Sequence, residues 1–252
     1  MSKNARRAGI VAALVSSASL IAPAFAGALP TGSLGSSDDK APGFTCAATS
    51  TETTTNGWGI PFADEKTHLS SYSAENVFDK DGSLELAVDG PTDRSVSYHS
   101  AGSISLADAA AKEIGFSERA VSTTAAFQLR LTGTTNPADN GFATLVWVPS
   151  QNGAPVTDKA VKHANIQDGQ WWSTRTIGGA AKGVPTDLDV IVGANPGAKV
   201  EHYGVSVGTG SAASKVFVDA VKFNGCTTNF AKKDAEPETG TGSLGNLFGS
   251  LS

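Results

Sequence analysis

The sequence is poor in cysteine, methionine and charge. Two Cys and one Met occur among 252 residues, and charged residues make up only 17% of the chain. Acidic side chains outnumber basic ones, 24 to 19, which gives a formal net charge of -5. A nucleic-acid partner is therefore not expected, because such proteins normally carry a basic surface. Hydrophobic residues still reach 40%, enough for one sizeable core and too many for a disordered chain.

Long apolar runs are also missing, apart from one short run near the N-terminus. Residues 10–21 are apolar or small, and a membrane-spanning helix needs about 20 predominantly apolar residues. The run follows Lys3, Arg6 and Arg7 and precedes the A-x-A sequence of residues 24–26. This order is typical of a secretory signal peptide. We expect residues 1–26 to be removed, and the mature protein, without a transmembrane helix, to be secreted or associated with the cell surface.

The two cysteines are Cys46 and Cys226, which lie 180 positions apart. In an oxidising compartment an even pair is most simply interpreted as one disulfide. The alternative is a nucleophilic cysteine with a histidine partner. We predict the disulfide, which would join the beginning of the folded domain to its end.

Composition separates a central domain from two extensions. Residues 27–43 are rich in Gly, Ser, Pro and Asp, and residues 231–252 in Lys, Glu, Thr, Gly and Ser, so both are expected to be flexible. The domain is expected at 44–230. In the tail, an i, i+3, i+4, i+7 spacing would form an apolar stripe on a helix that orders against an envelope lipid or protein, although three glycines disfavour that helix. The stripe consists of Leu244, Leu247, Phe248 and Leu251.

Short alternating segments, separated by turn residues, dominate the domain. Such segments predict antiparallel strands of an all-β sandwich or barrel. One short helix is expected at 106–114, where apolar residues follow helical spacing. The expected strands cover residues 83–88, 94–98, 125–132, 142–148, 187–192, 200–207 and 215–223.

Four motifs occur in an order that resembles a known family. They are Gly57-Trp58, GSLELAV at 82–88, DGQWW at 168–172 and KVFVDAV at 215–221. This order is similar to that of galactose-binding-like carbohydrate-binding modules and of uncharacterised secreted actinobacterial proteins. The resemblance implies an antiparallel jelly-roll β-sandwich. It also implies a structural calcium ion held by an Asp of the last strand, here Asp219.

No catalytic residue is evident. Ser206 lies in a G-x-S-x-G sequence, but a nucleophile elbow requires a strand, a turn and a helix, followed by a histidine, and here the last histidine precedes the serine. Residues 79–82 (DKDG) carry two acids of a calcium loop without its remaining ligands, so a simple turn explains them equally well. The histidines show no metal-ligand spacing. A glycosidase would need two carboxylates, and candidates are Glu85, Asp187, Asp189 and Glu201.

The adjacent pair Trp171 and Trp172 is the most informative aromatic feature. In an extended segment neighbouring side chains point to opposite faces, so both rings cannot enter the core. An exposed indole can stack on a sugar ring and donate an N–H hydrogen bond. We therefore expect a secreted, non-catalytic binding protein for an envelope or environmental glycan. The alternatives are a polysaccharide lyase or glycosidase on the same scaffold, and a structural envelope component.

Overall fold

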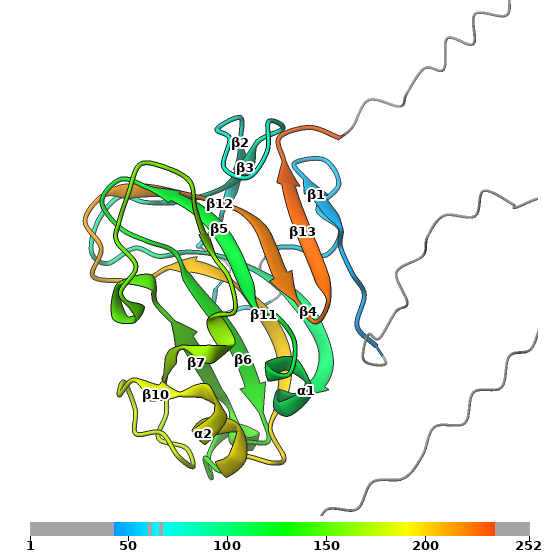
Figure 1. The fold of residues 1–252 in the computed structure, drawn as a ribbon, viewed down its shortest axis with the longest axis vertical. Coiled ribbons are helices and arrows are strands. Elements are labelled where there is room, and N and C mark those ends of the chain that lie inside the picture. Colours follow the sequence, from blue (N-terminus) through cyan, green and yellow to red (C-terminus); the bar gives the residue numbers. More distant parts are fainter. Residues whose placement is uncertain (1–42, 60–61, 66–67, 235–252) are drawn as a thin grey trace, which may run out of the picture. The chain divides into compact units, whose positions relative to one another are not determined.

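The computed structural model describes residues 43–59, 62–65 and 68–234, which form a sandwich of two β-sheets (Figure 1). One sheet has seven strands, and the long strand β12 lies at its centre, where it pairs with β3, β5 and β13. β1 pairs with β13 in parallel, while the other pairs of this sheet are antiparallel. Its strands are β1 Thr49–Thr51, β2 Ser71–Ser73, β3 Ser83–Val88, β5 Gly115–Ala120, β8 Val161–His163, β12 Ser214–Phe223 and β13 Cys226–Ala231.

The second sheet has six strands in the order β10-β9-β7-β6-β11-β4, all antiparallel. α1 and α2 lie together at one end of the sandwich (Figure 1). The elements here are β4 Ser95–Ser105, α1 Leu106–Ala110, β6 Ala126–Thr132, β7 Ala143–Trp147, β9 Gln170–Ser173, β10 Thr186–Asp187, α2 Leu188–Ala194 and β11 Lys199–Val207. The all-β sandwich expected from the sequence is confirmed.

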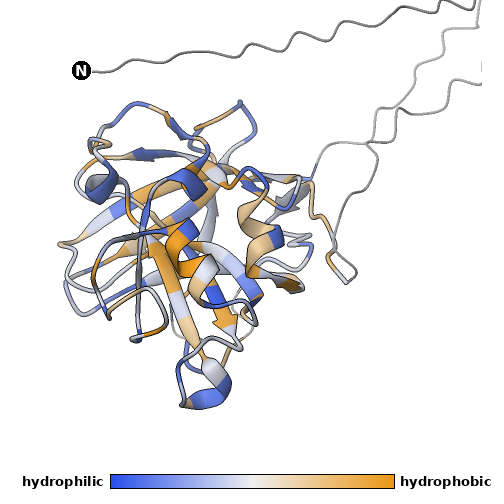
Figure 2. Cartoon of the chain, turned by 60° about the horizontal axis from the view of Figure 1, so that its bottom comes forward, coloured by the Kyte–Doolittle hydropathy of each residue, from blue (hydrophilic) through white to orange (hydrophobic). Residues whose placement is uncertain are grey.

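The core fills the space between the sheets, and hydrophobic colours gather there in Figure 2. Alternation along each strand decides which side chains enter it. In β6, Phe127, Leu129 and Leu131 are fully buried, whereas Gln128 and Arg130 point to the opposite face of the sheet. Six of the seven strands expected from the sequence are present in the structure, as β3, β4, β6, β7, β11 and β12.

The seventh expectation, a strand at 187–192, is wrong: Leu188–Ala194 forms α2. Leu188 and Ile191 are buried while Val190 is 49% exposed, which is the i, i+3 pattern of a helix. Asp187 occupies the N-cap position, although its side chain makes no capping hydrogen bond. The apparent period-two alternation was an accident of a segment with many apolar residues.

The other expected helix is shorter than predicted. α1 starts at Leu106, where the Ser105 hydroxyl caps it by accepting from the Asp108 amide N–H at 2.9 Å, but it ends at Ala110. Ile114 instead lies just before β5 and is fully buried. Within the described residues, no helix is long and apolar enough to cross a membrane.

A disulfide joins Cys46 to Cys226, as predicted. Cys226 is the first residue of β13, and Cys46 lies three residues before β1, its parallel neighbour. The bond therefore fixes the first strand to the last. Ordered packing continues past Phe230, because the Lys232 ammonium donates to the Tyr72 carbonyl oxygen at 2.8 Å. The expected leader at 1–26 and the apolar stripe of the tail lie outside the described residues.

Candidate functional site

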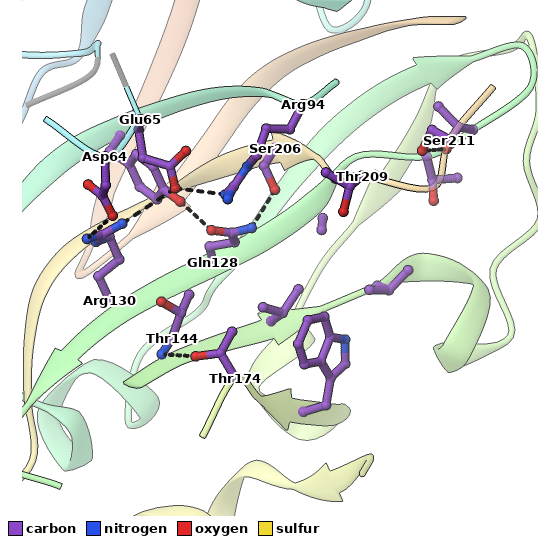
Figure 3. A pocket seen from close by; sticks show the side chains of 18 of the residues that line it. Asp64, Glu65, Arg94, Gln128, Arg130, Thr144, Thr174, Ser206, Thr209 and Ser211 are labelled. Atoms are coloured by element: carbon purple, nitrogen blue, oxygen red, sulfur yellow. Dashed lines mark hydrogen bonds and ion pairs between the residues drawn. The ribbon is translucent and has the colours of Figure 1, made fainter. Parts of the chain in front are cut away.

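The outer face of the six-stranded sheet carries a cavity of about 510 Å³, which we call the groove. Its floor is formed by the outward side chains of β6, β7, β9 and β11, which alternate with the core residues of the same strands. The loop residues Thr123, Thr124, Thr209 and Ser211 form part of its rim, and Figure 3 shows Thr209 and Ser211 beside the strands of the floor.

The two adjacent tryptophans separate as the alternation predicts. Trp171 is fully buried, contacts Phe127, and donates from its indole N–H to the Ile166 carbonyl oxygen at 2.9 Å. Trp172 is half-buried and lines the groove. Trp171 is thus a core residue that cannot reach a ligand in the groove, and Trp172 is the remaining candidate for ligand binding.

Trp172 is also the single most accessible tryptophan of the four in the chain. Trp58 and Trp147 are each 4% exposed, and both belong to the core. The indole N–H of Trp58 donates to the Thr228 hydroxyl at 3.3 Å. Trp172 therefore offers the indole surface through which this protein can contact a flat ligand.

A hydrogen-bonded row of polar side chains crosses the floor. The Tyr98 hydroxyl bonds to the Gln128 side-chain oxygen. The Gln128 amide N–H₂ donates to the Ser206 hydroxyl at 2.6 Å, and Figure 3 shows these two side chains. Burial, reinforced by the nearby Glu65 carboxylate, raises the pKa of Tyr98 to about 12. The phenol is therefore neutral at physiological pH and acts as a fixed hydrogen-bonding group.

One wall of the groove comes from the segment between β1 and β2. This segment is attached to β4 by bridges from Gly59 to Tyr98 and from Leu69 to Val96. It brings two carboxylates, Asp64 and Glu65, to the groove. The wall thus covers part of the outer face of β4, and its Asp64 and Glu65 reach Arg130 of β6.

Two arginines neutralise these carboxylates (Figure 3). Glu65 is only 3% exposed, and its Oε1 lies 2.8 Å from Arg94 Nη2 and 3.6 Å from Arg130 Nη1. Arg130 Nη2 also lies 3.3 Å from Asp64 Oδ2, and its guanidinium stacks over the Phe62 ring at 3.8 Å. The acids are thus held in ion pairs on one side of the groove.

Sequence motifs did not identify this wall or the polar row. The F-Q-L-R-L alternation of residues 127–131 could have placed Gln128 and Arg130 on an outer face, because their neighbours are apolar. Of the partners, Glu65 lies in a loop without a motif, and Arg94 directly precedes β4. Their meeting depends on how the segment between β1 and β2 folds over β4, which no local pattern shows.

The other residues considered from the sequence lie apart from one another. Ser206 is inside β11 and fully buried, so it is not at a nucleophile elbow. The carboxylate candidates lie in three different places: Glu85 forms an ion pair with Lys215 of the neighbouring strand β12, and Glu201 accepts from the Ser103 and Thr132 hydroxyls. The remaining two, Asp187 and Asp189, lie at the start of α2.

Asp219, the residue implied to hold calcium, is in β12 and not in the last strand, which is β13. It is fully buried, and its Oδ1 accepts from the Ala220 amide N–H at 2.6 Å and from the Phe230 amide N–H at 2.9 Å. Its Oδ2 is buried and has no hydrogen-bond partner among the described residues. Burial raises the pKa of this carboxyl to about 7. An unpartnered buried carboxylate oxygen fits a metal ligand.

No protein-family model, curated protein or solved structure matches this chain.

Proposed function

We propose that this protein is an exported, non-catalytic binding protein for a neutral polysaccharide, which it holds in the groove. The observation that carries the proposal is the position of Trp172, which is half-buried and lines the same groove as the fixed polar row, with Val146 of β7 between Trp172 and Gln128. An indole face covers the apolar C–H groups of a sugar ring, while hydroxyl and amide groups satisfy its polar edge.

The lining of the groove supports a hydroxyl-rich ligand. Its volume of about 510 Å³ lies within the range of small-molecule sites, roughly 300–1,000 Å³. Seven hydroxyl-bearing Ser and Thr side chains in addition to Ser206 line it, and each can both donate and accept a hydrogen bond. These are Thr123, Thr124, Thr144, Ser150, Thr174, Thr209 and Ser211.

The charges of the groove favour a neutral ligand. Asp64 and Glu65 face Arg94 and Arg130, and these four charges cancel in pairs. Arg175 also lines the groove, and it approaches Asp139 at 4.0 Å. A polyanion would need unpaired guanidinium groups, and a polycation would need unpaired carboxylates.

Export is supported by two features. The N-terminal sequence has the order of a secretory leader. The disulfide between Cys46 and Cys226 belongs to the class of bonds that forms and persists in oxidising compartments. A polysaccharide ligand is encountered in the same surroundings.

A polysaccharide-cleaving enzyme is the second candidate, because two carboxylates line the groove. Asp64 and Glu65 are, however, consecutive residues of one wall, whereas a glycosidase needs acid and base on opposite sides of the scissile bond. Tyr98, with its pKa raised to about 12, is poorly matched to act as a base near neutral pH. A binding protein is therefore a better interpretation of the groove than a polysaccharide-cleaving enzyme.

The experiment is a glycan-array screen of the purified protein, followed by affinity electrophoresis in gels containing the best polysaccharide. Trp172→Ala should weaken retention by about tenfold or more, because covering a large apolar side chain contributes about 1.5–3 kcal/mol. Phe78→Ala is the matched control, since Phe78 is a 61% exposed aromatic residue outside the groove. Equal retention of Trp172→Ala and wild type would refute the site. New reducing ends or unsaturated products would instead establish the enzyme.

A further inference from the structure

Three carboxylates from two distant segments converge at the junction of β3, β12 and β13. Asp79 and Asp81 belong to the turn that precedes β3, and Asp219 lies in the middle of β12. One carboxylate oxygen of each lies within 4.8 Å of one oxygen of each of the others. The two acids of the turn and the acid of the strand are 138 or more residues apart in the sequence, and only the fold brings them together.

The register of β12 explains why Asp219 points here. β12 pairs with β3 up to Val218 and with β13 from Val221 onward. Between these two stretches Ala220 has φ +49°, a left-handed conformation, and the pairing with β5 also shifts. The strand thus changes neighbours at Asp219, and the turn before β3 lies next to the irregularity. Gly82 permits the close packing of this turn against β2 and the residue after β13, because a Cβ there would lie 2.5 Å from the Ser73 carbonyl oxygen and 2.7 Å from the Lys232 amide nitrogen.

Within the part of the chain that the structure describes, no cationic side chain forms an ion pair with the cluster. None of the ion pairs found among the described residues includes Asp79, Asp81 or Asp219. The nearby Lys232 directs its ammonium to Glu52 at 2.9 Å and to the Tyr72 carbonyl oxygen at 2.8 Å, and its backbone N–H donates to the Asp81 carbonyl oxygen.

The cluster also contains a fully buried carboxylate oxygen with an unused lone pair. Asp219 Oδ1 is occupied by two backbone N–H groups, and Oδ2 has no partner among the described residues. Leaving a buried acceptor unsatisfied costs about 1–3 kcal/mol, and more for a charged group. Asn229 contributes to the same cluster, since its amide N–H₂ donates to Asp81 Oδ2 at 2.8 Å and its own buried Oδ1 has no hydrogen-bond partner in the described part of the chain.

We propose that Asp79, Asp81 and Asp219 bind one divalent cation of the calcium class. Ca²⁺ binds oxygen ligands at about 2.3–2.6 Å, so two ligands on opposite sides of the ion lie about 4.6–5.2 Å apart. A single ion can therefore contact all three carboxylates at their present separation. Mg²⁺ binds at about 2.0–2.1 Å and demands near-ideal octahedral geometry, which an irregular strand junction does not supply. The ion would tie the turn before β3 to the point where β12 changes neighbours.

The test is calorimetric titration of the purified, chelator-treated and desalted protein with CaCl₂ and, separately, MgCl₂. Wild type should bind one Ca²⁺ per chain more tightly than Mg²⁺, and its melting temperature should rise with Ca²⁺ until the site is saturated. Asp219→Asn keeps the size of the side chain and an acceptor for both backbone N–H groups, yet should weaken Ca²⁺ binding by at least about tenfold because the ligand charge falls.

Two further variants keep the result interpretable. Asp79→Asn changes a partly exposed side chain, so it should fold normally and still weaken Ca²⁺ binding. Asp158→Asn, an exposed acid outside the cluster, should bind as wild type does. Absence of Ca²⁺ binding up to about 10 mM, beyond the range of weak extracellular calcium modules, would overturn the proposal. So would unchanged binding in folded Asp79→Asn and Asp219→Asn, or a clear preference for Mg²⁺.

Discussion

Removing the disulfide should destabilise the domain strongly without changing its folded structure. The bond closes a loop of 180 residues, and the loop-entropy relation assigns such a loop about 5 kcal/mol at 25 °C. Native disulfides removed from small secreted domains typically cost about 2–5 kcal/mol. A double variant, Cys46→Ala with Cys226→Ala, should therefore lose about 4–5 kcal/mol. At roughly 2–4 °C per kcal/mol for a domain of this size, the melting temperature should fall by about 10–20 °C.

The folded state should survive because other contacts hold the N-terminal segment. Phe44 packs its ring against Tyr203 and Phe223, and Thr49 to Thr51 pair with β13. The assay is urea unfolding of the double variant, wild type and reduced wild type, with near-ultraviolet circular dichroism of each folded state. A loss below about 1 kcal/mol, or a variant with altered aromatic circular dichroism before unfolding, would refute the reasoning that the bond acts mainly on the unfolded chain.

Two smaller perturbations test the core and the electrostatics near the groove. Trp171→Ala should lower the free energy of unfolding by about 3–5 kcal/mol, because the Trp171 ring is fully buried. Trp172→Ala should lower it much less, because that ring is only half-buried. Equal losses in urea unfolding would show that the two rings do not face opposite sides of the sheet. Burial and the nearby Arg130 lower the pKa of His202 below its ordinary value of 6.5. The unfolded state thus takes up this proton first, so the contribution of His202 to stability is present above about pH 6.5 and is lost as the pH falls through the lower folded pKa. His202→Gln should flatten that part of the stability profile, and a wild-type-minus-variant difference that is constant with pH would contradict it.

Strand positions could be predicted from the sequence where one face of the strand is buried and the other is not. β3, β6 and β12 alternate regularly, and their predicted bounds differ from the observed ones by at most one residue. The segment of α2 was wrongly predicted as a strand, because its apolar residues satisfy both the period-two spacing of a strand and the spacing of a helix. Only the burial of Leu188 and Ile191 in the folded protein distinguishes the helix from the strand. Strands of two or three residues, such as β1 and β10, give no periodic signal at all.

The candidate site was predictable only in part, for a related reason. Backbone alternation alone dictates that Trp171 and Trp172 diverge, whatever the rest of the fold. Which of them faces the core depends on the register of β9 against β7, where Trp171 pairs with Trp147. The ion pair of Glu65 with Arg94, and the proximity of Asp81 to Asp219, depend on contacts between segments far apart in the chain. Such contacts leave no trace in local composition.

The most direct measurement of glycan binding in the groove follows the four indole N–H signals of the ¹⁵N-labelled protein by nuclear magnetic resonance during titration with the best-binding oligosaccharide. Trp58, Trp147 and Trp171 are at most 4% exposed, whereas Trp172 lines the groove, so a bound sugar can cover only one indole directly. The signal that disappears in Trp172→Phe identifies that ring. The account predicts that this signal shifts progressively to saturation while the other three move little. An unchanged Trp172 signal under conditions where the oligosaccharide is bound would contradict it.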